Sequence, residues 1–427
     1  MTERTPADDR AGTGARFGSC DPHGMTAEAV VYPRRFRAAP RRNERLARPL
    51  RLVSRVTAVD ERVLDRIGRR MLARDEVGAR LAEAMRRRGP GRVTRAQFGQ
   101  ALAGGVDTVA GAPAALRQFF AVVDDVPGWV DFELVERGGR FSRRLGRTAG
   151  DVLTALSLIG GYRFGGPADL LVATGGLVGP GAMRRLGETQ KWTTAVAQPG
   201  GLRRAGEGFR LTVHVRAMHA LVNHEFERNG RWDVERWGLP INRADQAATL
   251  GLFSSTLLLG ARALGWVVTR EESRAVMHLW KYVGWLMGVD EDWLFDTERE
   301  QNVFNYHVLC AQGDVTPAGA ALAAALVDGQ RTLDRGRFSD LRGRYARLRL
   351  LSLLRYFLRK ESLRDLGLPV TPAWVIPPVV AANLVRSGVV ARTRAGRRRL
   401  ERAGDAFAVA DRRRLLGTAP AEIADLP

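Results

Sequence analysis

Three histidines fall within fourteen residues, Val213 to Phe226, although the whole chain of 427 residues contains only six. An imidazole side chain can ligate a transition metal or transfer protons near neutral pH. His214, His219 and His224 are spaced five residues apart, which rotates each by about 140° from the next on a helix. They therefore cannot share one helix face. This excludes a two-histidine metal site of the i, i+4 kind within the segment.

His219 differs from the other two histidines by its place on the helix predicted at 208–228. The apolar stripe of that helix comprises Leu211, Val215, Met218, Val222 and Phe226. His219 lies inside this stripe, whereas His214 and His224 fall outside it. Two interpretations remain open: a core histidine satisfied by a backbone carbonyl, and a cofactor ligand. Periodicity alone favours the first.

Two neighbouring segments carry further polar side chains that could take part in a reaction. Arg185 and Thr189 are four residues apart in a helix predicted at 182–197, so they project from the same face. Taken alone, such a pair is typical of a solvated helix face. Asp169 lies in the first turn of a short helix predicted at 167–174, where a carboxylate complements the helix dipole.

Helical periodicity recurs along the chain and strand signals are almost absent, which predicts an all-α fold. The expected helices lie near 60–88, 95–104, 113–123, 150–160, 167–174, 182–197, 208–228, 243–265, 270–287, 290–311, 316–333 and 339–360. We expect a disordered polar arm over 1–44, an all-α catalytic domain over 45–360 and a helical basic extension over 361–427. A hydrophobic content of 45% and a charged content of 26% are those of a globular protein.

The two cysteines exclude a disulfide framework, and the lack of a CxxC or CxxCH motif argues against a zinc ribbon and covalently attached haem. The arginine pairs near the N-terminus are not followed by an apolar h-region, and the uncharged stretch "VTPAWVIPPVVAANLV" (370–385) is broken by three prolines, so we expect no membrane span of roughly 20 apolar residues. These features predict a cytoplasmic protein.

The net charge of +21 comes almost wholly from arginine that is spread along the chain. The arginines do not gather beside aromatic residues that would stack on bases, so we expect no nucleic-acid partner. The run "RTRAGRRRLERAG" near the C-terminus is dense in arginine. It leaves open a peripheral contact with an anionic membrane surface.

Three stretches in the middle of the chain resemble one family. They are "VHVRAMHALV" (213–222), "GLPINRADQAAT" (238–249) and "LWKYVGWLMGV" (279–289), and they resemble the rubber oxygenase (latex-clearing protein) and MpaB-type oxygenase family. "VPGWVDFELVERGGRF" (126–141) looks like the same family's upstream signature. The resemblance implies a globin-like core of helices, with extra N- and C-terminal helices, that holds non-covalent haem b and uses dioxygen as co-substrate. It also implies that His219 is the axial ligand of the haem iron, which reverses the preference drawn from periodicity.

The resemblance assigns roles to four more positions. Arg185 and Thr189 match an Arg-x-x-x-Thr pair that lines the distal pocket, where they would stabilise negative charge on dioxygen and donate a hydrogen bond. Asp169 stands near the position of a catalytic glutamate proposed as a base, but its side chain is one methylene shorter. Glu188 replaces a lysine that can cap the iron, and Lys191 lies three residues further on.

The sequence thus predicts a haem-b oxygenase that cleaves a carbon–carbon double bond in a hydrophobic small molecule, isoprenoid or lipid-like. Because Asp169 and Glu188 depart from the family pattern, a haem-binding or sensing protein of the same fold without the reaction is the alternative. A basic membrane-surface or nucleic-acid protein without cofactor is a third hypothesis.

Overall fold

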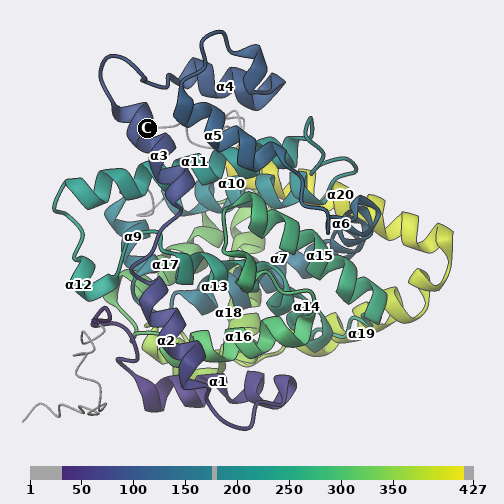
Figure 1. Ribbon diagram of the computed structural model, residues 1–427. Helices are drawn as coiled ribbons and strands as arrows, with labels where there is room; N and C mark the ends of the chain where they lie inside the picture. Colours follow the sequence, from purple (N-terminus) through teal and green to yellow (C-terminus); the bar gives the residue numbers. More distant parts are fainter. Residues whose placement is uncertain (1–30, 176–179, 418–427) are drawn as a thin grey trace, which may run out of the picture. The chain divides into compact units, whose positions relative to one another are not determined.

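The computed structural model describes residues 31–175 and 180–417, and within these ranges the chain forms helices and no strand, which confirms the all-α prediction (Figure 1). The first half contains α1 (Pro40–Ser54), α2 (Glu61–Arg70), α3 (Glu76–Arg86), α4 (Arg95–Gly104), α5 (Ala114–Asp124), α6 (Phe132–Leu145), α7 (Arg147–Val152), α8 (Ile159–Gly161), α9 (Pro167–Ala173), α10 (Pro180–Ala197) and α11 (Glu207–Arg228). The second half contains α12 (Val234–Trp237), α13 (Arg243–Phe253), α14 (Ser255–Ala263), α15 (Arg270–Leu286), α16 (Glu298–Ala311), α17 (Pro317–Asp328), α18 (Ser339–Asp365), α19 (Ile376–Gly388) and α20 (Arg394–Leu416). Single turns η1 (Val106–Thr108), η3 (Glu291–Trp293), η4 (Gly329–Arg331) and η5 (Val390–Arg392) lie between them, and a π-helical turn, η2 (Leu153–Leu158), joins α7 to α8.

The helix expected over 60–88 is two helices, α2 and α3, with a break after Arg70. The break makes backbone groups available to a distant segment: the carbonyl of Met71 accepts from the N–H of Leu239 at 2.9 Å, and that of Ala73 accepts from Arg243 at 2.9 Å. A continuous helix would have used these carbonyls internally. The helix expected over 243–265 is likewise divided, at Ser254.

The expected domain boundaries do not coincide with the ends of elements. Residues 1–30 lie outside the described part of the chain, but α1 already begins at Pro40, within the segment expected as a polar arm. At the other boundary, α18 continues through residues 360 and 361, with a bend at Arg359, whose φ is +64°.

Two adjacent glycines explain how α6 packs in the bundle. A Cβ at Gly138 would lie 2.3 Å from the carbonyl oxygen of Ala275 in α15, and one at Gly139 would lie 2.6 Å from the carbonyl oxygen of Ala197 at the end of α10. Only glycine permits this approach of backbones. The "ERGGR" stretch therefore brings α6 against both helices.

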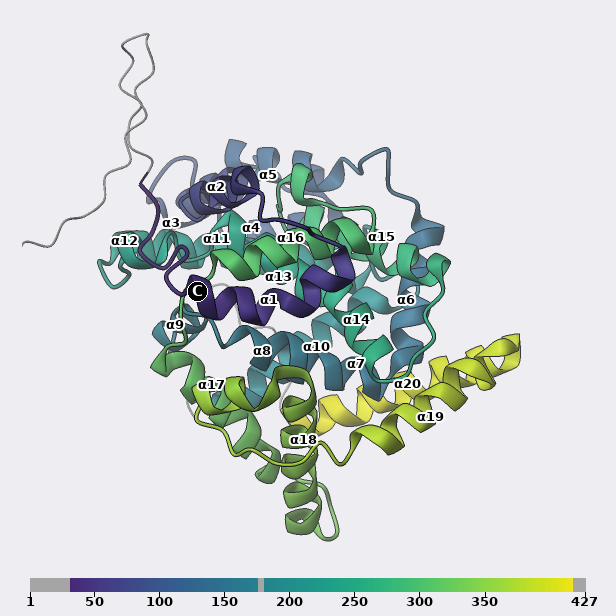
Figure 2. The same ribbon diagram turned by 90° about the horizontal axis from the view of Figure 1, so that it is seen from below.

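Helix α10 is held between α11 on one side and α20 on another (Figures 1 and 2). Towards α11, the indole N–H of Trp192 donates to the hydroxyl of Thr212 at 2.9 Å, and its ring packs edge-on against Phe253 and Trp280. Towards α20, the amide of Gln190 donates to Asp411 at 2.8 Å. In the described ranges, no helix has the length and apolar character needed to cross a bilayer.

Candidate active site

The His219 side chain lies within the helical bundle on α11. Its Nδ1 atom is buried and has no hydrogen-bond partner. Desolvation, and then the positive charge of Arg185, lower its pKa from 6.5 to about 4, and the opposing effect of Asp75 is smaller. The imidazole is therefore neutral at physiological pH. The backbone carbonyl that the other interpretation of the sequence requires does not engage this nitrogen.

The face of α11 that carries His219 is apolar but incompletely covered. Leu211, Val215, Met218 and Val222 are only partly buried, as is His219. The fully buried side chains of this helix instead include polar residues, Thr212, Arg216 and Asn223. The predicted stripe is thus apolar as expected, but except for Phe226 it is not the face packed most tightly in the core.

Arg185 on α10 acts electrostatically on two residues of other segments. Its charge lowers the pKa of His219 on α11, and it opposes the effect of burial, which raises the pKa of Tyr162 at the end of α8. The guanidinium is therefore the positive charge that the imidazole of His219 experiences.

The two other predicted residues of α10 have different surroundings. Thr189 is exposed. The side chain of Glu188 is mostly buried, and its carboxylate accepts from the guanidinium of Arg184, one turn earlier on the same helix, at 3.1 Å.

Asp169 serves as a cap in the first turn of α9. Its Oδ2 accepts from the backbone N–H of Gly166 at 3.0 Å and from the hydroxyl of Thr316 at 3.0 Å. This is the helix-terminal role that the sequence offered beside the catalytic one. The two bonds tie the start of α9 to the start of α17.

The other histidines of α11 lie in different environments. The ring of His214 packs near Phe98, with centroids 6.5 Å apart. His224 is partly buried, and desolvation followed by the charges of Arg228 and Arg86 lowers its pKa. In the described residues, no group of three or more His, Cys, Asp or Glu side chains could hold a metal ion.

A buried ion pair that the sequence did not indicate fixes the position of α11. Arg216, three residues before His219, binds Asp75 in a bidentate manner, with distances of 2.7 and 3.0 Å from Nε and Nη2 to the carboxylate oxygens. Both side chains are almost fully buried. Burial raises the pKa of Asp75, but the charge and hydrogen bonds of Arg216 outweigh it, so the pKa is lowered overall.

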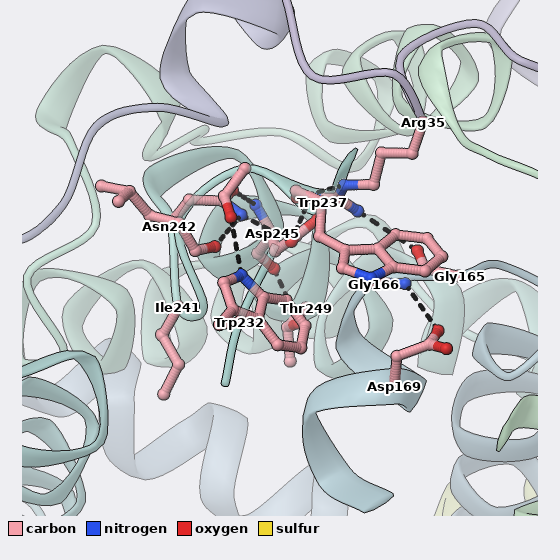
Figure 3. Close-up of polar contacts among 12 residues, drawn as sticks. Arg35, Gly165, Gly166, Asp169, Trp232, Trp237, Ile241, Asn242, Asp245 and Thr249 are labelled. Atoms are coloured by element: carbon pink, nitrogen blue, oxygen red, sulfur yellow. Dashed lines mark hydrogen bonds and ion pairs between the residues drawn. The ribbon is translucent and has the colours of Figure 1, made fainter. Parts of the chain in front are cut away.

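A second buried arginine connects the segments around α9 and α13 (Figure 3). Arg35 donates to the Asp245 carboxylate at 2.5 Å, to the Trp237 carbonyl at 2.7 Å and to the Gly165 carbonyl at 3.3 Å. Asn242 donates to the same carboxylate at 2.7 Å and caps α13. In sequence, Arg34-Arg35 reads as a surface pair, because nothing local marks one member as buried.

Residues 146–393, more than half of the chain, match the family described as ER-bound oxygenase mpaB/B′/rubber oxygenase, catalytic domain. This chain belongs to that family. Asp169, Arg185, Glu188, Thr189 and His219 all lie within the matched range. The N-terminal helices α1 to α6, including the 126–141 stretch that looks like an upstream signature, and the C-terminal helix α20 lie outside it.

One curated protein and one solved structure that are similar to this chain also carry rubber oxygenase or latex clearing protein names. The chain is 24% identical to the rubber oxygenase of Streptomyces sp. (strain K30) over 255 residues, which are 59% of this chain and 60% of that protein. The match therefore spans less than two thirds of the relative. The solved structure of latex clearing protein LCP in the closed state superposes with a TM-score of 0.63 at 21% identity, covering 87% of this chain and 95% of that one. This likeness supports the shared all-helical fold.

Proposed function

We propose that this protein is a haem-b-dependent oxygenase that uses dioxygen to cleave a carbon–carbon double bond in a hydrophobic, isoprenoid or lipid-like substrate. Membership of an oxygenase catalytic-domain family supports the reaction class. The observation that carries the proposal is the neutral imidazole of His219, which has a buried nitrogen without a protein partner.

The residues around His219 fit a haem group. A haem iron needs only one histidine from the protein, and that histidine must be neutral to coordinate. The partly accessible apolar side chains of α11 suit a porphyrin or a hydrocarbon chain better than a hydrated polar ligand. His219 is the residue that would hold the haem iron.

When bound, haem would supply the redox chemistry that activates dioxygen. The charge of Arg185 can stabilise negative charge that develops near His219, since both side chains are partly buried, and such interactions are stronger there than in open water. Tyr162 keeps its proton there, because burial raises its pKa. Thr189 is the hydrogen-bond donor that shares the helix face of Arg185.

Asp169 and Glu188 have narrower roles in this proposal. The hydrogen bonds to Asp169 from the described residues engage Oδ2, so Oδ1 is the oxygen that would accept a substrate proton. Glu188 remains paired with Arg184, so it adds no free charge to the haem side of α10.

The decisive experiment is the spectrum of the protein expressed with excess haem. We expect a Soret band and a pyridine haemochrome typical of protohaem, and we expect His219→Ala to lose both. His214→Ala and His224→Ala are matched controls on the same helix and should keep haem at the wild-type ratio. A wild-type protein without haem, or a His219→Ala variant with full haem, would contradict the proposal.

A second candidate function, haem binding without oxygenation, is favoured by the engagement of Asp169 as a helix cap. Oxygen uptake with polyisoprenoid and unsaturated lipid substrates separates the two. Stoichiometric haem together with no uptake across such a panel would favour the sensor.

A further inference from the structure

The first turns of α18 present large apolar side chains to solvent. Phe338, Leu341, Tyr345 and Leu348 are exposed by 62%, 68%, 50% and 44%. At 100° per residue Leu341, Tyr345 and Leu348 fall within an arc of about 60°, so they form one stripe along the helix, and Phe338 precedes this stripe at the N-cap. Trp374, exposed by 44%, extends the stripe by packing against Tyr345 with ring centroids 5.8 Å apart. In Figure 2 this end of α18 projects beyond the helices around it.

The backbone of Phe338 has a strained conformation, and its ring is exposed to solvent. Its φ of +62° and ψ of +38° are left-handed, a conformation that costs a bulky residue about 1 kcal/mol or more and that glycine or asparagine adopts readily. Burial of the ring in the core does not offset this free-energy cost, because the ring is mostly exposed. Strain of this kind in an exposed aromatic residue is typical of a binding surface.

Arginines flank the apolar stripe on both sides. Between residues 328 and 348 there are six arginines against three aspartates. Arg331, Arg344 and Arg347, together with Leu348, line a cleft of about 370 Å³. Arg347 pairs with Asp328 at 2.8 Å, whereas Arg331 and Arg344 are exposed. The cleft thus offers guanidinium groups at the edge of an apolar surface.

This combination identifies the kind of partner. A nucleic acid would use the arginines but would gain little from Leu341 and Leu348, and an apolar protein surface would leave the arginines unpaired. A bilayer with anionic lipids satisfies both, because its phosphates pair with arginine and its acyl boundary accepts Phe, Leu, Tyr and Trp.

The arginine-rich C-terminal run is a weaker candidate for this role. It belongs to α20, whose acidic residues pair inward with α6: Asp405 lies 3.0 Å from Arg143, and Glu401 lies 3.9 Å from Arg144. The exposed apolar residues beside that run, Leu384, Val385 and Val389, are all aliphatic, whereas α18 also presents aromatic rings. We therefore place the membrane contact on α18.

We propose that the amino-terminal part of α18, residues 338–348 with Trp374, docks on an anionic lipid bilayer. The apolar stripe enters the headgroup–acyl boundary, and the cleft formed by Arg331, Arg344 and Arg347 holds a lipid phosphate. This inference does not depend on haem or on oxygenase activity.

The test is co-sedimentation of the full chain with vesicles of phosphatidylcholine alone or mixed with phosphatidylglycerol, at low and physiological salt. We expect binding to the mixed vesicles that weakens as salt rises. Phe338→Ser/Leu341→Ser should weaken it about tenfold or more. Arg331→Gln/Arg344→Gln should weaken it about 25-fold, since each arginine near a charged surface contributes about fivefold.

Two matched variants control for composition. Arg398→Gln/Arg399→Gln removes the same charge from exposed positions of α20, and Val122→Ser/Val126→Ser removes exposed valines beside Asp124 and Asp125. Each should change vesicle binding by no more than about twofold, since neither lies on the proposed surface. All variants should keep the wild-type thermal midpoint, because the substituted side chains are exposed.

Three results would overturn the proposal. The first is wild-type binding to mixed vesicles by both α18 variants, or no binding by the wild type. The second is duplex DNA bound more tightly than vesicles, with Phe338→Ser/Leu341→Ser unaffected. The third is a dimer in solution that Leu341→Ser dissociates, because the stripe would then be an interface between two copies of the chain.

Discussion

The three histidines of α11 have the same side chain but lie in different surroundings. His224 lies near Glu83 and Glu225 as well as near arginines, and His214 packs beside an aromatic ring. Only His219 combines strong desolvation with a nearby positive charge and a nitrogen without a partner. At the scale of single residues, the surroundings of the side chain therefore distinguish His219 as the candidate ligand.

The depressed pKa of His219 makes folding depend on pH in a defined direction. Its value is about 4 in the folded chain against 6.5 for a free imidazole, so the unfolded chain binds more protons between these values. The stability contributed is fully present above pH 6.5 and is lost as pH falls towards 4. In protein prepared without haem, we expect His219 to account for a loss of about 2 kcal/mol between about pH 7 and pH 5.

Urea unfolding of the wild type and of His219→Leu at both pH values measures the part of the stability loss that His219 causes. The variant should lose less stability than the wild type on acidification, by about the amount given above. An identical pH dependence in the two proteins would show that the imidazole is solvated in the folded state.

At the scale of elements, the rotation of α11 depends on the buried pair between Arg216 and Asp75. The pair joins α11 to the segment before α3, and Arg216 also donates to the carbonyl of Leu286 at the end of α15, at 3.3 Å. His219 lies one turn further along α11. The pair therefore fixes the part of α11 that carries the imidazole.

Removing one member of this pair should destabilise the fold strongly. We expect Asp75→Asn to cost about 3–5 kcal/mol, because it leaves Arg216 buried and uncompensated. The double variant Asp75→Leu/Arg216→Met should recover much of that cost. Glu83→Gln, which breaks the exposed i, i+4 pair with Arg87, should cost less than about 1 kcal/mol. Chemical denaturation measures all of these, and equal costs for Asp75→Asn and Glu83→Gln would show that the buried pair is not a structural anchor.

At the scale of the whole chain, Arg35 joins parts that are far apart in sequence. Its ion pair with Asp245 spans 210 positions, and its other bonds reach Gly165 and Trp237. The same network leads through Gly166 to the cap formed by Asp169 (Figure 3). Arg35 thus determines where the start of α9 lies relative to α13.

The adjacent Arg34 provides a matched control. Its side chain is 68% exposed and pairs at 3.6 and 3.4 Å with Asp233 and Glu235 at the surface. We expect Arg35→Gln to cost about 3–5 kcal/mol of unfolding free energy and Arg34→Gln less than about 1 kcal/mol. Hydrogen exchange should show faster opening of α9 and α13 in the Arg35 variant alone. Equal effects of the two substitutions would mean that the Arg35 network contributes no more than a surface pair.

Much of the fold was predictable from local pattern. The 3.6-residue periodicity identified most of the helices, and the caps at Thr269 and Asn242 mark helix starts in the structure as their residue types indicate. The breaks at Met71–Asp75 and at Ser254 were not predictable. At Met71–Asp75, the backbone and the Asp75 carboxylate form bonds with residues far away in sequence, which a local pattern does not contain.

The same division applies to the candidate site. The sequence by itself determined that His219 is separated from the other histidines by helical rotation, that it lies on an apolar stripe, and that Arg185 shares a face with Thr189. Only the tertiary structure decided that this stripe is incompletely covered, that Asp169 caps α9, and that Glu188 is paired with Arg184. The buried roles of Arg35 and Arg216 also required it. Burial and charge pairing depend on which helices meet, and that is set by contacts between segments far apart in sequence, such as the pair of Arg35 and Asp245, which are 210 positions apart.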